Sequence, residues 1–141
     1  MADLVLADTG PLVAFLDRND PYHLWACERI REFTGPLLTC EAVLSECAHL
    51  TERADPGNQQ LMTLLRLGGL RLTYSLRRDL EAVATQMAKY RDVPMSLADA
   101  CLVRMSELHD RARVFTLDSD FKRYRRHGRQ AIPLIIPGPT R

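Results

Sequence analysis

Three acidic residues follow directly on short apolar segments of the chain. Asp8 comes after Leu4–Ala7, and Asp118 and Asp120 come after Val114–Thr116. Short continuous apolar runs are typical of buried parallel strands, and the carboxyl ends of such strands are where α/β sheets gather functional groups. Structural roles compete with this interpretation, because Asp8 is also a good cap for a following helix and Asp118 for a short helix after it.

Two more acids lie on predicted helices among apolar residues. At about 100° per residue, Glu46 falls on the face of Val43 and Cys47, which we expect to meet the core. Asp99 shares a face with buried-type residues and also ends the capping-box pattern that begins at Ser96. The alternatives are a Glu46 at the rim that reaches solvent or an arginine, and an Asp99 that only caps its helix.

Carboxylates gathered in one place repel one another, so a fold that brings them together usually supplies a cation. Oxygen ligands without Cys or His favour a hard ion, Mg or Mn, with one or two ions at the site. Such an ion activates water and stabilises the leaving oxygen of a phosphodiester. The acids therefore indicate phosphoryl transfer.

The elements that would position these acids alternate along the chain. We expect strands at 4–7, 37–39, 70–73, 114–116 and 132–136, and helices at 12–16, 21–33, 41–53, 59–67, 76–90 and 96–109, with Asp20 as the cap before Pro21. Alternation of strands and helices predicts a central parallel sheet covered on both faces, a three-layer α/β/α sandwich. The 141 residues suit a single domain over 1–141 with one hydrophobic core.

The overall composition excludes few classes of function. The formal net charge is only +1, so the chain lacks the large basic excess that is typical of nucleic-acid-binding proteins. The chain shows no secretory signal pattern and no apolar run of roughly 18 residues, so we expect a cytoplasmic location and no membrane partner. The four cysteines have no zinc-ligand spacing and are expected to be reduced and mostly buried: Cys27, Cys40, Cys47 and Cys101.

The ordered series of acids resembles the PIN domain family over roughly residues 3 to 136. The resemblance is carried by Asp8-Thr9 after the first strand, Glu46 in an apolar helix, Asp99 within SLADA, and Asp118 within FTLDSDF. It implies the α/β/α sandwich and a Mg- or Mn-dependent ribonuclease. Many family members of this size are VapC-like toxins that form homodimers and are held inactive by a small antitoxin protein.

The resemblance also implies roles for particular residues. Asp8, Glu46, Asp99 and Asp118 match the metal-binding, catalytic acids, Asp120 matches a position that is often acidic, and Thr9 and Thr116 match small hydroxyl residues beside the site. The basic residues that follow the acidic turn are candidates for RNA phosphate contacts, with a solvated helical face as the alternative: Lys122, Arg123, Arg125 and Arg126.

Three other classes of protein are alternatives to this interpretation. A haloacid-type phosphohydrolase needs two acids on the first strand, and a receiver domain needs a lysine after a late strand; neither pattern is present. The remaining alternative is a non-catalytic PIN-fold binding module for a protein or RNA partner. A helical stripe of Leu61, Leu64, Leu65 and Leu67 would suit a dimer or antitoxin contact, but core packing explains it more simply.

Overall fold

A five-stranded parallel sheet forms the centre of the computed structural model, which describes residues 2–138. Its strand order is β3-β2-β1-β4-β7, and every neighbouring pair is parallel. The strands are β1 (Val5–Ala7), β2 (Leu37–Thr39), β3 (Leu70–Leu72), β4 (Arg113–Phe115) and β7 (Leu134–Ile135). The central position of β1, with all three residues buried, places Asp8 at the middle of the sheet's carboxyl edge.

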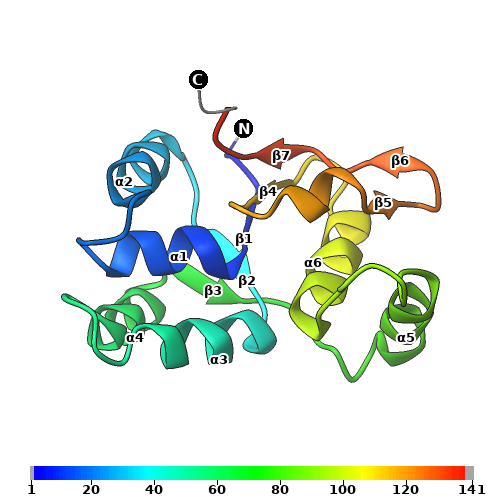
Figure 1. Cartoon of the computed structure of the whole chain (residues 1–141), viewed down its shortest axis with the longest axis horizontal. Coiled ribbons are helices and arrows are strands. Elements are labelled where there is room, and N and C mark those ends of the chain that lie inside the picture. Colours follow the sequence, from blue (N-terminus) through cyan, green and yellow to red (C-terminus); the bar gives the residue numbers. More distant parts are fainter. Residues whose placement is uncertain (1, 139–141) are drawn as a thin grey trace.

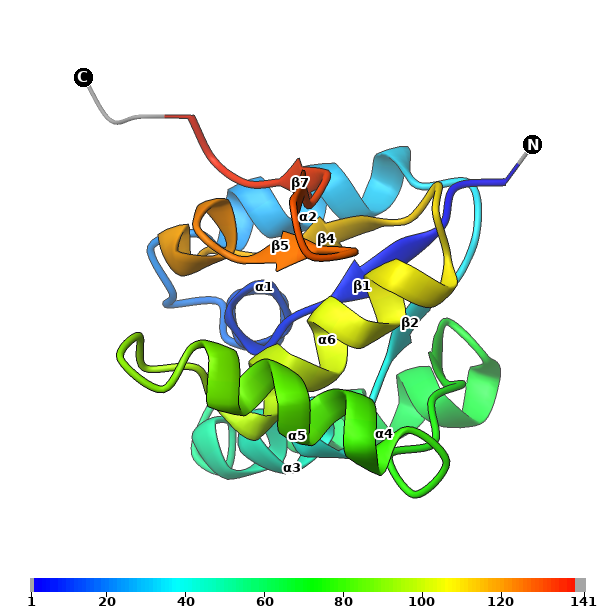
Figure 2. The same ribbon diagram turned by 90° about the vertical axis from the view of Figure 1, so that its right-hand side faces the viewer.

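Helices cover both faces of this sheet, so the predicted α/β/α sandwich is confirmed (Figure 1). The helix α6, with α5 packed outside it, lies on one side, and α1 and α2 lie on the other (Figure 2). The helices are α1 (Thr9–Leu16), α2 (His23–Glu32), α3 (Glu41–Leu50), α4 (Asn58–Leu67), α5 (Leu80–Lys89) and α6 (Leu97–Leu108).

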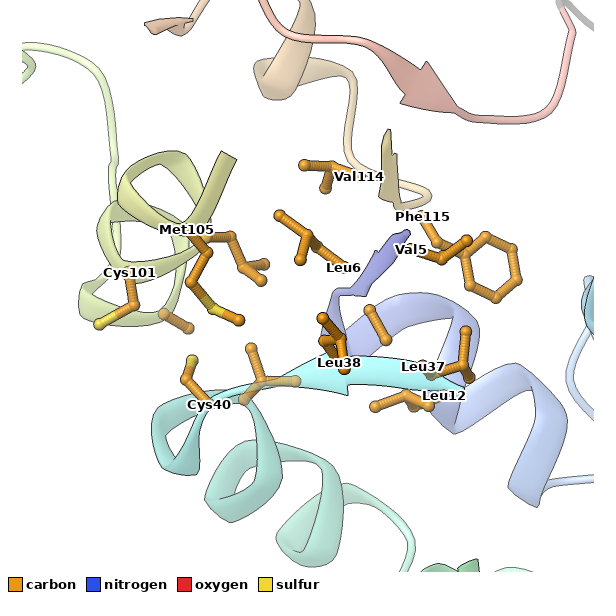
Figure 3. Packing of buried hydrophobic residues seen from close by; sticks show 14 of the residues in the cluster. Val5, Leu6, Leu12, Leu37, Leu38, Cys40, Cys101, Met105, Val114 and Phe115 are labelled. Atoms are coloured by element: carbon orange, nitrogen blue, oxygen red, sulfur yellow. The ribbon is translucent and has the colours of Figure 1, made fainter. Parts of the chain in front are cut away.

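The strand side chains alternate between these two helical layers. Leu6 and Val114 face α6, whereas Val5 and Phe115 face α1 and α2 (Figure 3). This follows from the two-residue period of a strand, and strands buried on both faces are apolar throughout. The ring of Phe115 packs on Trp25 of α2 at 5.3 Å between ring centroids, which anchors that helix over β4.

The C-terminal part departs most from expectation. Residues 125–131 form an antiparallel hairpin of β5 (Arg125–Arg126) and β6 (Gln130–Ala131) rather than a solvated helical face. The chain reverses at His127 and Gly128, whose φ angles of 50° and 81° lie in the left-handed region that glycine adopts at low cost. Such a short, charged hairpin has no apolar alternation, so sequence periodicity does not reveal it.

Two helices begin later than predicted. The carboxylate of Asp20 accepts a hydrogen bond from the amide of Tyr22 at 2.8 Å and forms a turn, so α2 begins at His23 rather than at Pro21. The helix α5 begins at Leu80, because residues 76–79 form a turn. In both cases local turn hydrogen bonds compete successfully with the helix.

The leucine stripe of α4 is divided between core and surface. Leu61 is fully buried, whereas Leu67 is 80% exposed, so core packing accounts for only part of the stripe. The cysteines are free thiols, and three of the four are buried, as predicted. None of the helices within residues 2–138 has the length and apolar character needed to cross a membrane.

Candidate functional site

Four acids predicted from the sequence line one cleft at the carboxyl edge of the sheet. Asp8 follows β1, Glu46 lies on α3, Asp99 is in the first turn of α6, and Asp118 follows β4. The cleft has a volume of about 470 Å³. Residues separated by more than a hundred positions therefore meet at one site, where the sheet topology directs them.

Asp8 is held at the centre of this cleft by the pairing of β1 with β4. Because Ala7 pairs with Phe115, the next residues, Asp8 and Thr116, also lie side by side. The Thr116 hydroxyl donates to Asp8 Oδ2 at 2.7 Å, and the amide of Thr9 donates to Oδ1 at 2.8 Å. The second bond makes Asp8 the cap of α1, so the capping role and the cleft position coincide.

Asp99 also combines a cap with a place in the cleft. The Ser96 hydroxyl accepts the amide of Asp99 at 3.0 Å, and Asp99 Oδ2 accepts the amide of Ser96 at 3.3 Å, which completes the predicted capping box. The same Oδ2 accepts the hydroxyl of Tyr124 at 3.0 Å. Asp99 is only 8% exposed, so these donors satisfy a carboxylate that water hardly reaches.

Glu46 does not face the core as predicted. It is exposed, and so is Leu50, one turn further on, at 56%, because both lie at the edge of the face that buries Val43 and Cys47. That edge forms one wall of the cleft. The Thr9 hydroxyl donates to Glu46 Oε2 at 3.3 Å and links α1 to α3 across the site.

Asp118 and Asp120 have different environments. Asp118 caps the short 3₁₀ helix η1 (Ser119–Lys122), accepting the amide of Asp120 at 2.8 Å, and it lines the cleft. The Asp120 carboxylate lies 3.7 Å from the Arg123 guanidinium. Asp120 is not among the described residues that line the cleft, so the structure does not place this predicted acid at the site.

The electrostatics show that the cleft is an unfavourable place for negative charge. Burial raises the pKa of Asp8 to about 6, hydrogen bonds from Thr116 and Thr9 oppose the rise, and the charges of Asp99 and Asp118 add to it. Burial likewise raises the pKa of Asp99. Burial and the nearby Asp99 raise the pKa of Tyr124, so its hydroxyl remains a proton donor at neutral pH.

The donor set fits a hard divalent cation in its chemistry. The four predicted acids and Asp20, which also lines the cleft, all offer oxygen, and a cation between them would relieve the repulsion that acts on Asp8. Within residues 2–138, however, no three His, Cys, Asp or Glu side chains are arranged so that they could hold an ion as they stand. Side-chain adjustment would have to accompany ion binding.

One of the predicted phosphate-contact residues has a different role. Arg126 is 5% exposed, and its guanidinium donates to the carbonyls of Ser106 at 3.0 Å and Asp110 at 2.9 Å. It fastens the hairpin to α6 and is not available to RNA, so that expectation is wrong for Arg126. Lys122 and Arg123 are exposed; Lys122 is the last residue of η1 and Arg123 follows it, so both lie close in sequence to Asp118 at the cleft.

Several residues at the site escaped the sequence analysis. Asp20 and Leu117 line the cleft, and Tyr124 contacts Asp99 from behind. Asp20 was assigned only to helix capping, and Tyr124 stands among basic residues that drew attention to charge. The one signal that could have drawn attention to Tyr124 is that the hydroxyl of a buried tyrosine needs a hydrogen-bond partner.

Comparison with known proteins agrees with this architecture. A model of the PIN domain matches residues 5–127, a range that contains the four predicted acids of the cleft, so the chain belongs to the PIN domain family. The chain is also similar to Ribonuclease VapC26 of Mycobacterium tuberculosis (strain ATCC 25618 / H37Rv), with 26% identity over 116 residues. The matched part covers 81% of this chain and 86% of that relative.

Proposed function

We propose that this chain is a Mg- or Mn-dependent endoribonuclease that cleaves phosphodiester bonds in RNA. The observation that carries the proposal is the convergence of Asp8, Glu46, Asp99 and Asp118 in one cleft. The family match and the ribonuclease name of the similar VapC protein support it.

In this proposal Asp8, Asp99 and Asp118, with Glu46 at the exposed wall, hold one or two divalent ions. When bound, such an ion supplies Lewis-acid stabilisation of charge on the phosphate. Thr116 donates to one oxygen of Asp8, and Ser96 to one oxygen of Asp99, which limits how far these two carboxylates move in the adjustment that ion binding requires. Preorganised ligands of this kind lower the cost of binding.

The RNA strand would be positioned by the exposed basic residues beside the cleft. Lys122 and Arg123 lie within five residues of Asp118, and Arg125 follows. The Arg125 guanidinium donates to the carbonyls of Lys122 and Tyr124, so it is partly committed to the fold. Contacts from Lys122 and Arg123 to phosphates would position the chain without reading sequence, and would be salt-sensitive.

We also propose that the protein is the toxin of a toxin–antitoxin pair in the cytoplasm and that it forms a homodimer. The similar VapC protein supports the first point, and the free thiols agree with a reducing compartment. A second groove of about 470 Å³, between α2 and α4, offers an apolar surface for a small antitoxin protein, with the 80%-exposed Leu67 on its wall.

The test of the nuclease proposal compares wild-type protein, Asp99→Asn and Asp55→Asn on a mixed single-stranded RNA pool with Mn²⁺, Mg²⁺ or EDTA. Asp55 is a matched control because it is an exposed acid outside the cleft. We expect cleavage by wild type and Asp55→Asn, and none by Asp99→Asn or with EDTA. Clean wild-type protein that neither cuts RNA nor is stabilised by Mn²⁺ would favour the non-catalytic binding module.

A further inference from the structure

Tyr124 contacts Asp99 from outside the cleft. Tyr124 is fully buried, and its hydroxyl lies 3.0 Å from Asp99 Oδ2, across a sequence separation of 25 residues. No functional role for this tyrosine follows from the sequence pattern. The bond is between a neutral donor and a carboxylate, a pairing roughly twice as strong as one between neutral groups.

Two aromatic contacts hold the Tyr124 ring in place. The ring lies 5.2 Å from that of Tyr90 at an interplanar angle of 69°, and 5.2 Å from that of Phe121 at 82°. Both are edge-to-face arrangements, the geometry that aromatic pairs prefer. A ring fixed on two sides presents its hydroxyl from a fixed point, so Asp99 meets a rigid donor rather than a mobile one.

Tyr124 also belongs to the same rigid segment as Asp118. The amide of Phe121 donates to the carbonyl of Asp118 at 3.2 Å, and the amide of Tyr124 donates to the carbonyl of Asp120 at 3.2 Å. Residues 118–124 are thereby wound into one compact turn. The hydroxyl bond to Asp99 consequently fastens the segment that carries Asp118 to the helix that carries Asp99.

Two hydrogen bonds meet on one oxygen of Asp99. Oδ2 accepts both the Ser96 amide and the Tyr124 hydroxyl. Asp99 also lines the cleft, so the same side chain meets these donors and the cleft. Carboxylates that bind metal ions commonly have such donors behind them, and these donors fix their orientation.

From these contacts we propose that Tyr124 is a positioning residue that sets Asp99 relative to Asp118 for divalent-ion binding. The proposal rests on the proposed metal-dependent function. It predicts that removal of one hydroxyl oxygen, with the ring and its packing retained, weakens ion binding. Loss of a group that orients a metal ligand typically lowers affinity by about 10- to 100-fold.

The variant Tyr124→Phe removes only this hydroxyl. Tyr90→Phe is the matched control, because Tyr90 belongs to the same ring cluster but its oxygen accepts the amide of Arg125 at 2.9 Å and does not touch Asp99. The melting temperature of each protein is measured in EDTA and across a Mn²⁺ titration. The Mn²⁺ concentration that supports half-maximal RNA cleavage is measured in parallel.

We expect Tyr124→Phe to melt below wild type in EDTA, because the buried Asp99 loses a donor, and in addition to require at least about 10-fold more Mn²⁺ for half of its stabilisation and cleavage. Tyr90→Phe should keep the wild-type Mn²⁺ requirement. An unchanged requirement in Tyr124→Phe overturns the role of Tyr124 and leaves the nuclease proposal intact. Absence of any Mn²⁺ effect on wild type refutes the metal-dependent function itself.

A measurement on the unsubstituted chain decides the matter if Tyr124→Phe fails to fold. The sequence has four tyrosines, so incorporation of 3-fluorotyrosine yields four ¹⁹F signals. Addition of Mg²⁺ should displace the Tyr124 signal, because its hydroxyl contacts Asp99, and leave that of the exposed Tyr22 in place. A Tyr124 signal that stays fixed while Mg²⁺ stabilises the protein contradicts the proposal.

Discussion

Replacement of Asp8 by asparagine should stabilise the ion-free protein. Asp8 is 7% exposed and burial raises its pKa to about 6, against an ordinary value of 3.8. Each pKa unit corresponds to ~1.4 kcal/mol, so the ionised carboxylate costs the folded state ~3 kcal/mol at neutral pH. Asparagine carries no charge and avoids this cost. Such a gain is common at functional sites, where residues chosen for activity often lower the stability of the fold.

Part of that gain is lost to hydrogen bonding. Two donors, the Thr116 hydroxyl and the Thr9 amide, point at the two oxygens of Asp8. An asparagine side chain has one acceptor oxygen, so one donor loses its partner at a cost of about 1 to 2 kcal/mol. The expected net stabilisation of Asp8→Asn in EDTA at pH 7.5 is therefore about 1 to 2 kcal/mol.

The advantage of Asp8→Asn should depend on pH. Between pH 3.8 and about 6 the folded protein retains the Asp8 proton while the unfolded chain has lost it, so the stability of wild type falls as pH rises through this window. Above the window the cost is constant, and below it the cost is absent. The difference between variant and wild type should thus be largest above pH 6 and shrink toward pH 4.

Urea unfolding in EDTA at several pH values measures this difference, and Asp55→Asn, a substitution of an exposed acid, should follow wild type. Excess Mn²⁺ should reverse the order: wild type gains ~2.7 kcal/mol at 100 times the dissociation constant, and Asp8→Asn gains little. If Asp8→Asn is less stable than wild type in EDTA at pH 7.5, or its advantage does not shrink on acidification, the electrostatic account of the cleft is wrong.

Further predictions concern the groups around the cleft. Thr116→Val removes the hydroxyl that donates to Asp8 and should lower the free energy of unfolding at pH 7.5 by about 1 to 3 kcal/mol, with a smaller loss at pH 4, as read by urea unfolding. Arg126→Ala leaves two carbonyls without their buried donor and should cost about 3 kcal/mol or more, visible as a fall in melting temperature. Arg123→Ala, at a 62%-exposed side chain, should change stability by less than about 0.5 kcal/mol. It should instead weaken RNA binding and reduce the salt dependence of that binding by about one phosphate contact, measured by fluorescence anisotropy at several salt concentrations. A fall in stability for Arg123→Ala comparable to that of Arg126→Ala would contradict the assignment of the two arginines.

Much of the fold follows from local patterns in the chain. The apolar runs before Asp8 and Asp118 do form the strands β1 and β4, and the run over 37–39 forms β2. The capping roles of Asp8, Asp99 and Asp118 were also predictable, because a cap depends only on residues within one helical turn. Since parallel strands end at a common edge, the shared location of Asp8 and Asp118 could be expected as well.

The remaining features depend on contacts between distant segments. The bond from Thr116 to Asp8 spans 108 residues and exists because β1 and β4 pair in one register. Whether Glu46 faces the core or the cleft depends on how α3 packs against α1, which the helical period does not determine. The period predicts a core-facing Glu46, whereas the packing exposes it at the wall of the cleft.

Charge patterning was least informative near the C-terminus. Arg123 and Arg126 look alike in a run of basic residues, yet one is exposed and the other fastens a hairpin to α6. Tyr124 stands between them and reaches Asp99 only because the turn from Asp118 winds its ring against Tyr90. The local sequence determined the strands and the helix caps. The partner of each buried polar group depended instead on which distant segments packing brought within hydrogen-bond distance.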